Sequence, residues 1–237
     1  MPDVDLIFQL NGLKNRRSGS LCEPGSLAWT TANSKIPLFN FHIEIYSTKQ
    51  RFKNTIQSPK PMTKGLPLAE IRDSKVLTED SDEAKELYNQ SRFGNLTDSR
   101  VELSLFEALY LVEKKKITVI DGKNKPIKQD KLEKRFKKLQ KNFLINYAVF
   151  KDMRNRGYVV KTALKFGANF RVYDRGVKPG EDHARWILYP VHESGTLTWH
   201  EFAAKNRVAH STKKRLLLGV VDDEGDVSYW EVRWLRP

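Results

Sequence analysis

Aspartate and glutamate cluster at Asp222-Asp223-Glu224-Gly225-Asp226, so a metal site is the first chemistry to consider. A two-metal site needs carboxylates that converge on one point of the fold. Here they share one tight turn and lack the oxygen-ligand spacing of a calcium loop. The single cysteine, Cys22, allows neither an internal disulfide nor a cysteine-based zinc site. The sequence therefore predicts no metal centre and no cofactor.

Three other side chains, Tyr173, His183 and Lys214, are of types that move protons or neutralise negative charge. Taken singly, a strand tyrosine usually packs in a core, and a lysine is usually a solvated surface charge. His183 follows Pro179-Gly180-Glu181-Asp182 in a loop, and imidazole titrates near neutral pH. His210 is a competitor close to Lys214, although we expect it to pack or to cap a helix end. The remaining histidines have no evident partner and are interpreted as structural: His42, His192 and His200.

The chain carries a net charge of +13, spread over its whole length rather than held in a tail. This excess favours a folded basic surface for a polyanion, whether RNA, DNA or an acidic membrane. No apolar run approaches the ~20 residues of a membrane span. Residues 1–5 lack the pattern of a signal peptide. We therefore expect a soluble, cytoplasmic protein with no membrane partner.

Composition divides the chain into three regions: 1–73, 74–143 and 144–237. The first holds six of the ten prolines and many polar residues. Its one clear element is a strand over residues 39–45, where apolar and polar residues alternate. Residues 57–62 are expected to be a linker. This extension has no fold that the sequence assigns.

Residues 74–143 are expected to form a small α+β domain. Asp80 and Glu83 resemble a capping box that opens a helix through about Gln90. Residues 104–111 predict a second helix, and its expected buried face consists of Leu105, Ala108, Leu109 and Val112. A short strand at 117–120 and a solvated, lysine-rich helix at 130–141 follow.

Residues 144–237 are expected to form a compact α/β domain with a mixed sheet. Its first helix, marked by Ile145, Val149 and Met153, ends at Gly157. Thr198 and Glu201 predict a capping box for a helix through Ala209. Residues 216–221 are too apolar for an edge strand and are placed centrally. The other expected strands are at 158–160, 169–173, 186–189 and 227–234. The fold class is therefore α/β (α+β), a small α+β amino-terminal domain followed by a compact mixed-sheet α/β domain.

Several motifs agree in order and spacing with one known family. They are Arg156-Gly157-Tyr158-Val159-Val160-Lys161-Thr162, Lys165-Phe166-Gly167-Ala168-Asn169-Phe170-Arg171-Val172-Tyr173, His183, Arg207-Val208-Ala209-His210-Ser211-Thr212-Lys213-Lys214 and Val221-Asp222-Asp223-Glu224-Gly225-Asp226. Upstream, Arg92-Phe93-Gly94 and Leu103-Ser104-Leu105-Phe106-Glu107-Ala108-Leu109-Tyr110-Leu111 resemble its amino-terminal domain. Over about residues 74–237 the chain resembles the tRNA-splicing endonucleases, most closely the archaeal enzymes. Residues 1–73 lie outside the resemblance.

The resemblance implies metal-independent cleavage of precursor tRNA at bulge–helix–bulge intron boundaries, leaving 2′,3′-cyclic phosphate and 5′-hydroxyl ends. The family's catalytic tyrosine, histidine and lysine fall on Tyr173, His183 and Lys214. Such a reaction needs a base for the 2′-hydroxyl, an acid for the leaving 5′-oxygen and positive charge near the phosphorane. A tyrosine can be the base where a nearby cation lowers its pKa, a role that suits Lys214. His183 suits the acid.

The resemblance also implies RNA-binding and assembly features. Arg207 would grip a bulged base in its own or a neighbour's site, since arginine stacks on bases and pairs with phosphates. Lys213 stands where the family usually has arginine and is expected to contact RNA. The acidic loop, formed by Asp222, Asp223, Glu224 and Asp226, would dock into a basic groove of a neighbouring subunit. A homo- or hetero-oligomer with two active sites is therefore expected.

Two other functions stay open from the sequence. One is an RNA-binding structural subunit whose partner chain cuts, but such subunits generally lack the three catalytic residues. The other is an unrelated basic DNA nuclease, which would need a carboxylate–lysine site and magnesium. The sequence has no such constellation.

Overall fold

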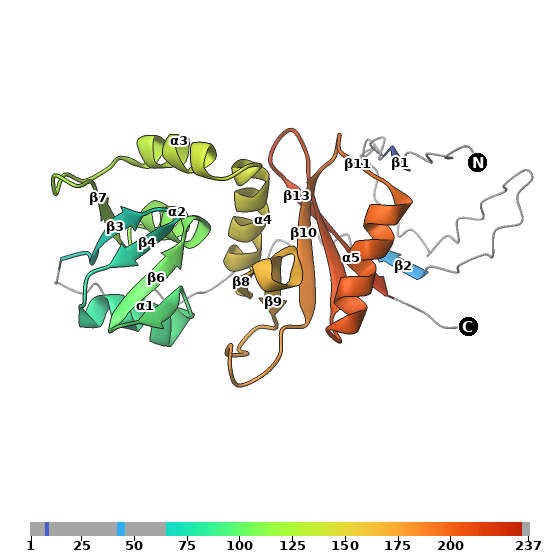
Figure 1. Cartoon of the computed structure of the whole chain (residues 1–237), viewed down its shortest axis with the longest axis horizontal. Coiled ribbons are helices and arrows are strands. Elements are labelled where there is room, and N and C mark those ends of the chain that lie inside the picture. The colour runs from blue at the N-terminus through green and yellow to red at the C-terminus, as the bar shows by residue number, and fades with distance from the viewer. Residues whose placement is uncertain (1–7, 10–41, 46–64, 234–237) are drawn as a thin grey trace, which may run out of the picture.

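The computed structural model of the chain describes residues 8–9, 42–45 and 65–233. Two mixed β-sheets lie on either side of helix α4 (Phe143–Asn155), as Figure 1 shows. The five-stranded sheet with three helices forms an amino-terminal unit (residues 68–139), and the six-stranded sheet with α4 and α5 forms a carboxy-terminal unit (residues 143–233, joined by 42–45). The α+β class expected from the sequence is confirmed. Within the described ranges, no helix is long and apolar enough to cross a membrane.

The sheet of the amino-terminal unit is built from short strands. Their order is β5 (Asn95–Thr97), β6 (Arg100–Ser104), β4 (Lys75–Thr78), β3 (Leu68–Arg72) and β7 (Thr118–Ile120). Only β7 was expected, because strands this short carry too few alternating residues to give a clear period. β3 pairs with β4 and β7, so the sheet begins before residue 74, inside the region that composition set apart.

Helix α1 (Asp82–Ser91) begins at Ser81, whose hydroxyl accepts the Ala84 N–H at 3.2 Å. The capping box expected from Asp80 and Glu83 was therefore wrong. The Asp80 carboxylate pairs instead with the Lys85 ammonium at 2.6 Å, which leaves Ser81 to cap the helix.

Helix α2 (Leu105–Glu113) begins with a capping box between Ser104 and Glu107. The expectation of a single buried face was too narrow, because every residue from Leu105 to Leu111 is buried. The helix packs against its own sheet and also against α3 (Gln129–Leu139) and α4. A helix enclosed on all sides is apolar all round. α3 buries only Leu132 and Phe136, as expected for a solvated helix.

The sheet of the carboxy-terminal unit has the order β2 (His42–Ile45), β13 (Val227–Arg233), β12 (Arg215–Val221), β10 (Trp186–His192), β9 (Ala168–Tyr173) and β8 (Val159–Ala163). β10 and β12 run parallel, and every other pair is antiparallel. The central place of β12 is confirmed. The strand expected at 39–45 is confirmed over residues 42–45, which form β2 at the edge of this sheet. Residues 39–41 lie outside the described residues.

The two faces of the six-stranded sheet are covered by different helices. α4 packs on one face, and α5 (Trp199–Ser211) covers the other, as Figure 1 shows. The predicted capping box of Thr198 and Glu201 at the start of α5 is confirmed. A 3-10 turn, η1 (Leu164–Phe166), joins β8 to β9, and β11 (Thr196–Leu197) pairs with β1 (Phe8–Gln9). The expected linker at 57–62, Cys22 and Trp234 lie outside the described residues.

Gly94 joins α1 to β5 at a position that no other residue fits well. Its φ is +65°, in the left-handed region. A Cβ there would stand 2.6 Å from both the Glu102 carbonyl oxygen and Val101 Cγ1. Glycine is therefore required by conformation and by space at once.

We expect Gly94→Ala to lower the free energy of unfolding by about 2–4 kcal/mol, the sum of left-handed strain and overpacking. Urea unfolding measures this change. Gly122→Ala is the matched control, because a Cβ at Gly122 meets nothing within 4 Å. The control should stay within about 0.5 kcal/mol of the parent. Equal losses in both variants would contradict the role given to Gly94.

Candidate active site

Strand register aligns the ends of β9, β10 and β12 at one end of the six-stranded sheet. Val172 pairs with Trp186, and Trp186 pairs with Arg215. Tyr173 is the last residue of β9, and Lys214 directly precedes β12, so both lie one position beyond this row. Adjacent strands are about 4.8 Å apart, which puts the two backbones ~10 Å from each other. Their side chains can therefore reach one phosphodiester.

A buried carboxylate fixes this end of the sheet. Glu231 of β13 accepts hydrogen bonds from the Trp186 indole at 2.7 Å, from Arg215 at 3.0 Å and from Arg233 at 2.7 Å. Burial alone would raise the pKa of Glu231, but these donors hold the pKa below its ordinary value. The ionised carboxylate thus ties β10, β12 and β13 together beneath the site.

His183 lies in the loop of residues 174–185, which joins β9 to β10 at this same end of the sheet. An ion pair of 2.9 Å between Arg185 and Asp174 closes the base of the loop. The Asp182 carboxylate accepts the backbone N–H of His183 at 2.6 Å. The imidazole is exposed, and within the described residues no hydrogen bond joins it to Tyr173 or Lys214.

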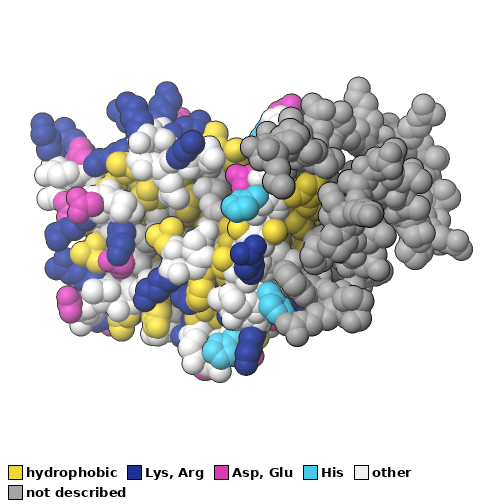
Figure 2. All heavy atoms as spheres, turned by 45° about the vertical axis from the view of Figure 1, so that its right-hand side comes forward, with side chains coloured by type: hydrophobic (Ala, Val, Ile, Leu, Met, Phe, Trp, Pro, Cys, Tyr) yellow, Lys and Arg dark blue, Asp and Glu magenta, His cyan; other side chains and the backbone are white. Residues whose placement is uncertain are grey.

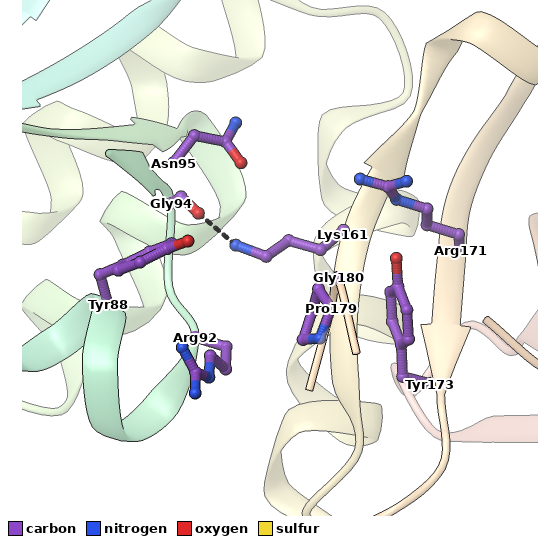
Figure 3. Close-up of a pocket in the computed structure, with 9 residues that line it drawn as sticks. All are labelled: Tyr88, Arg92, Gly94, Asn95, Lys161, Arg171, Tyr173, Pro179 and Gly180. Carbon is purple, nitrogen blue, oxygen red and sulfur yellow. Dashed lines mark hydrogen bonds between the residues drawn. The ribbon is translucent and has the colours of Figure 1, made fainter. Parts of the chain in front are cut away.

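Tyr173 is 4% exposed and lines a cavity of about 310 Å³ between the two units (Figure 3). The guanidinium carbon of Arg171 lies 5.8 Å from the centre of the Tyr173 ring. We call this cavity the cationic pocket, because its lining contains no Asp or Glu but three basic residues. Its lining residues are Tyr88, Arg92, Gly94, Asn95, Lys161, Arg171, Tyr173, Pro179 and Gly180.

Lys214 is half-buried where α5 passes into β12. Its ammonium donates a hydrogen bond to the Thr212 carbonyl at 2.8 Å and lies 5.6 Å from the centre of the Phe166 ring. Within the described part of the chain it has no carboxylate partner, so its charge is free to act on an anion. Lys213, just before it, is exposed and adopts a left-handed φ of 55°.

Arg207 lies on the exposed side of α5, while Asn206 and Ala209 of the same helix are buried. Among the described residues no carboxylate pairs with it. The surface ion pair that would make Arg207 merely structural is therefore absent from this part of the chain. His210 is exposed near the end of α5.

The acidic loop connects β12 to β13 at the other end of β12. Its turn is held by the Asp226 N–H, which donates to the Asp222 carboxylate at 2.8 Å. The Asp223 side chain is 85% exposed, and its carboxylate lies 3.3 Å from His192 Nε2. The sequence indicates no partner for His192, and in the structure Asp223 is that partner. Over the described ranges, no three His, Cys, Asp or Glu side chains are grouped so as to hold a metal ion.

A buried ion pair joins the two units behind the pocket. The Lys161 ammonium of β8 donates to the Gly94 carbonyl and lies 3.3 Å from the Glu107 carboxylate of α2. Glu107 also accepts the Gly94 N–H at 2.8 Å. Burial lowers the pKa of Lys161, and the charge of Glu107 opposes that shift. In the sequence these residues stand out only as parts of motifs; the one local signal is that Lys161 is the single charged residue of β8.

Comparison with known proteins identifies the family of the chain. Residues 143–229 match the model of the tRNA intron endonuclease catalytic C-terminal domain, and residues 68–132 match that of its N-terminal domain. The chain belongs to the tRNA intron endonuclease family. Relatives named tRNA-splicing endonuclease include one from Nanoarchaeum equitans, 46% identical over 61% of this chain and 97% of the relative. One from Thermococcus gammatolerans is 39% identical over 70% of this chain and 96% of the relative.

As a member of this family the protein is a tRNA-intron endonuclease, and the resemblance read from the motifs is confirmed. The matched regions cover both units, so Tyr88 and Arg92 on one wall of the cationic pocket belong to the N-terminal domain of the family. The opposite wall, with Tyr173, belongs to the catalytic domain.

We expect Lys161→Met and Glu107→Gln each to lower the free energy of unfolding by about 3–5 kcal/mol, because each leaves an uncompensated buried charge or an unpaired partner. The double variant should lose clearly less than the sum, because no charge remains buried. Urea unfolding of the three variants gives the coupling.

The exposed pair Lys75–Glu102, with nitrogen and oxygen 2.6 Å apart, is the control for this cycle. Its coupling should stay below about 1 kcal/mol, as is usual for surface ion pairs. Additive losses at Lys161 and Glu107 would show that the buried pair does not hold the units together.

Proposed function

We propose that the protein cuts precursor tRNA at the bulge–helix–bulge boundaries of an intron by a metal-independent reaction. The observation that carries the proposal is the strand register. It sets Tyr173 and Lys214 two strands apart at one sheet end, where the loop of His183 also begins and ends. The matches to both family domains support the choice of substrate.

In the proposed reaction Tyr173, as its phenolate, accepts the proton of the 2′-hydroxyl and becomes the neutral phenol. The 2′-oxygen then forms a bond to the adjacent phosphorus, and the bond from phosphorus to the 5′-oxygen breaks. His183 gives a proton to that 5′-oxygen, and the Lys214 ammonium stabilises the charge on the phosphorane. The products are a 2′,3′-cyclic phosphate and a 5′-hydroxyl, with atoms and protons balanced.

RNA would be held by exposed basic side chains of both units. Figure 2 shows Lys and Arg side chains gathered over the amino-terminal unit at the left of the view. The exposed side of α3 contributes Lys131, Lys134, Arg135 and Lys138. Arg207 is exposed and without a carboxylate partner among the described residues, which suits a base of the bulge. Lys213 is proposed to contact the RNA backbone next to it.

We expect the purified chain to cut a bulge–helix–bulge RNA in excess EDTA and to leave cyclic phosphate ends. Tyr173→Phe, His183→Ala and Lys214→Met should each slow the single-turnover rate by about 10²–10⁴-fold, because each removes a proton-transfer or charge-stabilising group. Gel assays with mapped product ends measure both results.

His200→Ala is the matched control, because His200 is exposed on α5 and should not alter the rate. Products with a 3′-hydroxyl, or complete loss of cutting in EDTA, would reject the mechanism. A Tyr173→Phe variant that keeps most of its rate would reject tyrosine as the base. Binding without cutting would favour a structural subunit whose partner chain cuts.

We also propose that the acidic loop docks into a basic groove of a neighbouring subunit and so forms an oligomer with two active sites. The exposed Asp223 and Glu224 carboxylates contrast with the net charge of +13, which favours such a contact electrostatically. The Asp223→Asn, Glu224→Gln double variant should therefore have a lower mass in solution by light scattering. The equally exposed Asp73→Asn, Asp98→Asn variant is its charge-matched control. An unchanged mass in the loop variant would refute docking.

A further inference from the structure

We propose that the cationic pocket binds a phosphodiester of the RNA substrate adjacent to the one that is cut, with Arg171 and Arg92 as its ligands. This inference rests on the proposed function for the identity of the RNA. It goes further by giving the amino-terminal unit a part in substrate binding and by naming two residues for it.

The position of the pocket supports this assignment. Tyr173, the proposed base, forms part of its wall, and Pro179 and Gly180 of the His183 loop form another part. Figure 3 shows the Tyr173 hydroxyl and the Arg171 guanidinium on the same side of the pocket. An RNA strand whose phosphate is attacked at Tyr173 can therefore place a neighbouring phosphate beside Arg171.

The charges in the pocket are unbalanced. Lys161 and Arg171 are directly opposite each other on β8 and β9, an arrangement of like charges that destabilises a sheet. Lys161 is compensated by Glu107. Arg171 has no hydrogen bond or ion pair among the described residues, and its Nε atom is buried without an acceptor. An unpaired buried donor is normally matched by a ligand or water.

Arg92 provides a second cation from the facing unit. It ends α1 in a left-handed conformation, with a φ of 56°, and its guanidinium carbon lies 5.9 Å from the Tyr88 ring centre. Like Arg171, it has no carboxylate partner in the described part of the chain. Two guanidinium groups on opposite walls suit an anion with several oxygens, which they can bind through paired N–H donors.

Phosphate fits better than a carboxylate ligand here. Each guanidinium can donate paired N–H groups to phosphate oxygens, so Arg171 and Arg92 can bind the RNA backbone from the two walls. The proposed substrate supplies such groups at every nucleotide. The pocket therefore guides the RNA strand between the two units and holds it in register with Tyr173.

The test uses two pocket variants, Arg171→Met, which keeps the aliphatic part of the side chain, and Arg92→Gln. Arg72→Gln, an exposed arginine in the β3–β4 hairpin, is the control. The probe is a bulge–helix–bulge RNA with 2′-deoxy nucleotides at the cleavage sites. We expect Arg171→Met and Arg92→Gln to bind it about 10- to 100-fold more weakly, the range of charged hydrogen bonds. The slope of log affinity against log salt should shrink by about 0.7–0.9 for each, but not for the control.

Thermal unfolding distinguishes a loss of RNA binding from a loss of folded-state stability. The melting temperature of Arg171→Met should be unchanged or higher, because the lost group makes no hydrogen bond or ion pair within the described residues. A lower melting temperature with unchanged RNA affinity and salt slope would overturn the proposal. The proposal would also be overturned if the pocket bound free anions only. In that case inorganic phosphate, added at constant ionic strength, would raise the melting temperature of the parent but not of Arg171→Met, and both proteins would bind RNA equally.

Failure of the proposed function would look different. A parent protein that binds the RNA but does not cut it, with the weaker binding and smaller salt slope still seen in Arg171→Met, would support the pocket and reject cleavage by this chain. A parent that cuts, with both arginine variants cutting and binding equally well, would reject the pocket alone.

Discussion

The rest of the structure depends on the buried ion pair between Lys161 and Glu107. Each partner makes further bonds: Glu107 caps α2 and accepts the Gly94 N–H, while Lys161 donates to the Gly94 carbonyl. A buried pair of this kind is not a large source of stability by itself. Its effect is geometric, because loss of either partner leaves a charge in a dry interior. One orientation of the two units therefore has a far lower free energy than others.

Packing around that pair reinforces the same orientation. The guanidinium of Arg154 lies 3.8 Å from the centre of the Phe93 ring and donates to the Ser91 carbonyl at 2.7 Å. The Phe106 ring of α2 is stacked on Phe143 of α4 and in edge contact with Phe170 of β9, each with centroids 5.1 Å apart. Aromatic and cation–π contacts thus run from the amino-terminal unit to the second sheet.

The two ends of the central strand β12 lie at two different candidate sites. It begins beside Lys214 and ends at the acidic loop, and its seven residues span ~23 Å at the usual rise per residue. A subunit docked on the acidic loop would therefore leave the strand ends near Lys214 open to RNA.

The sheet is also wider than the family motifs alone indicate, since β2, from the leading 73 residues, pairs along β13. That pairing gives part of the extension a structural role.

The sequence by itself determined the class of the fold, most elements of the carboxy-terminal unit and the family. Those features depend on local patterns, such as the apolar run of β12, the capping box at Thr198 and the ordered motifs. It did not determine the short strands β3 to β6 or the Ser81 cap, where several polar residues compete within one turn. Only the tertiary structure decided that Lys161 pairs with Glu107 and that Arg171 and Arg92 line one pocket. Charges distant in the chain become partners only when strand register and domain packing bring them together, and local sequence contains neither.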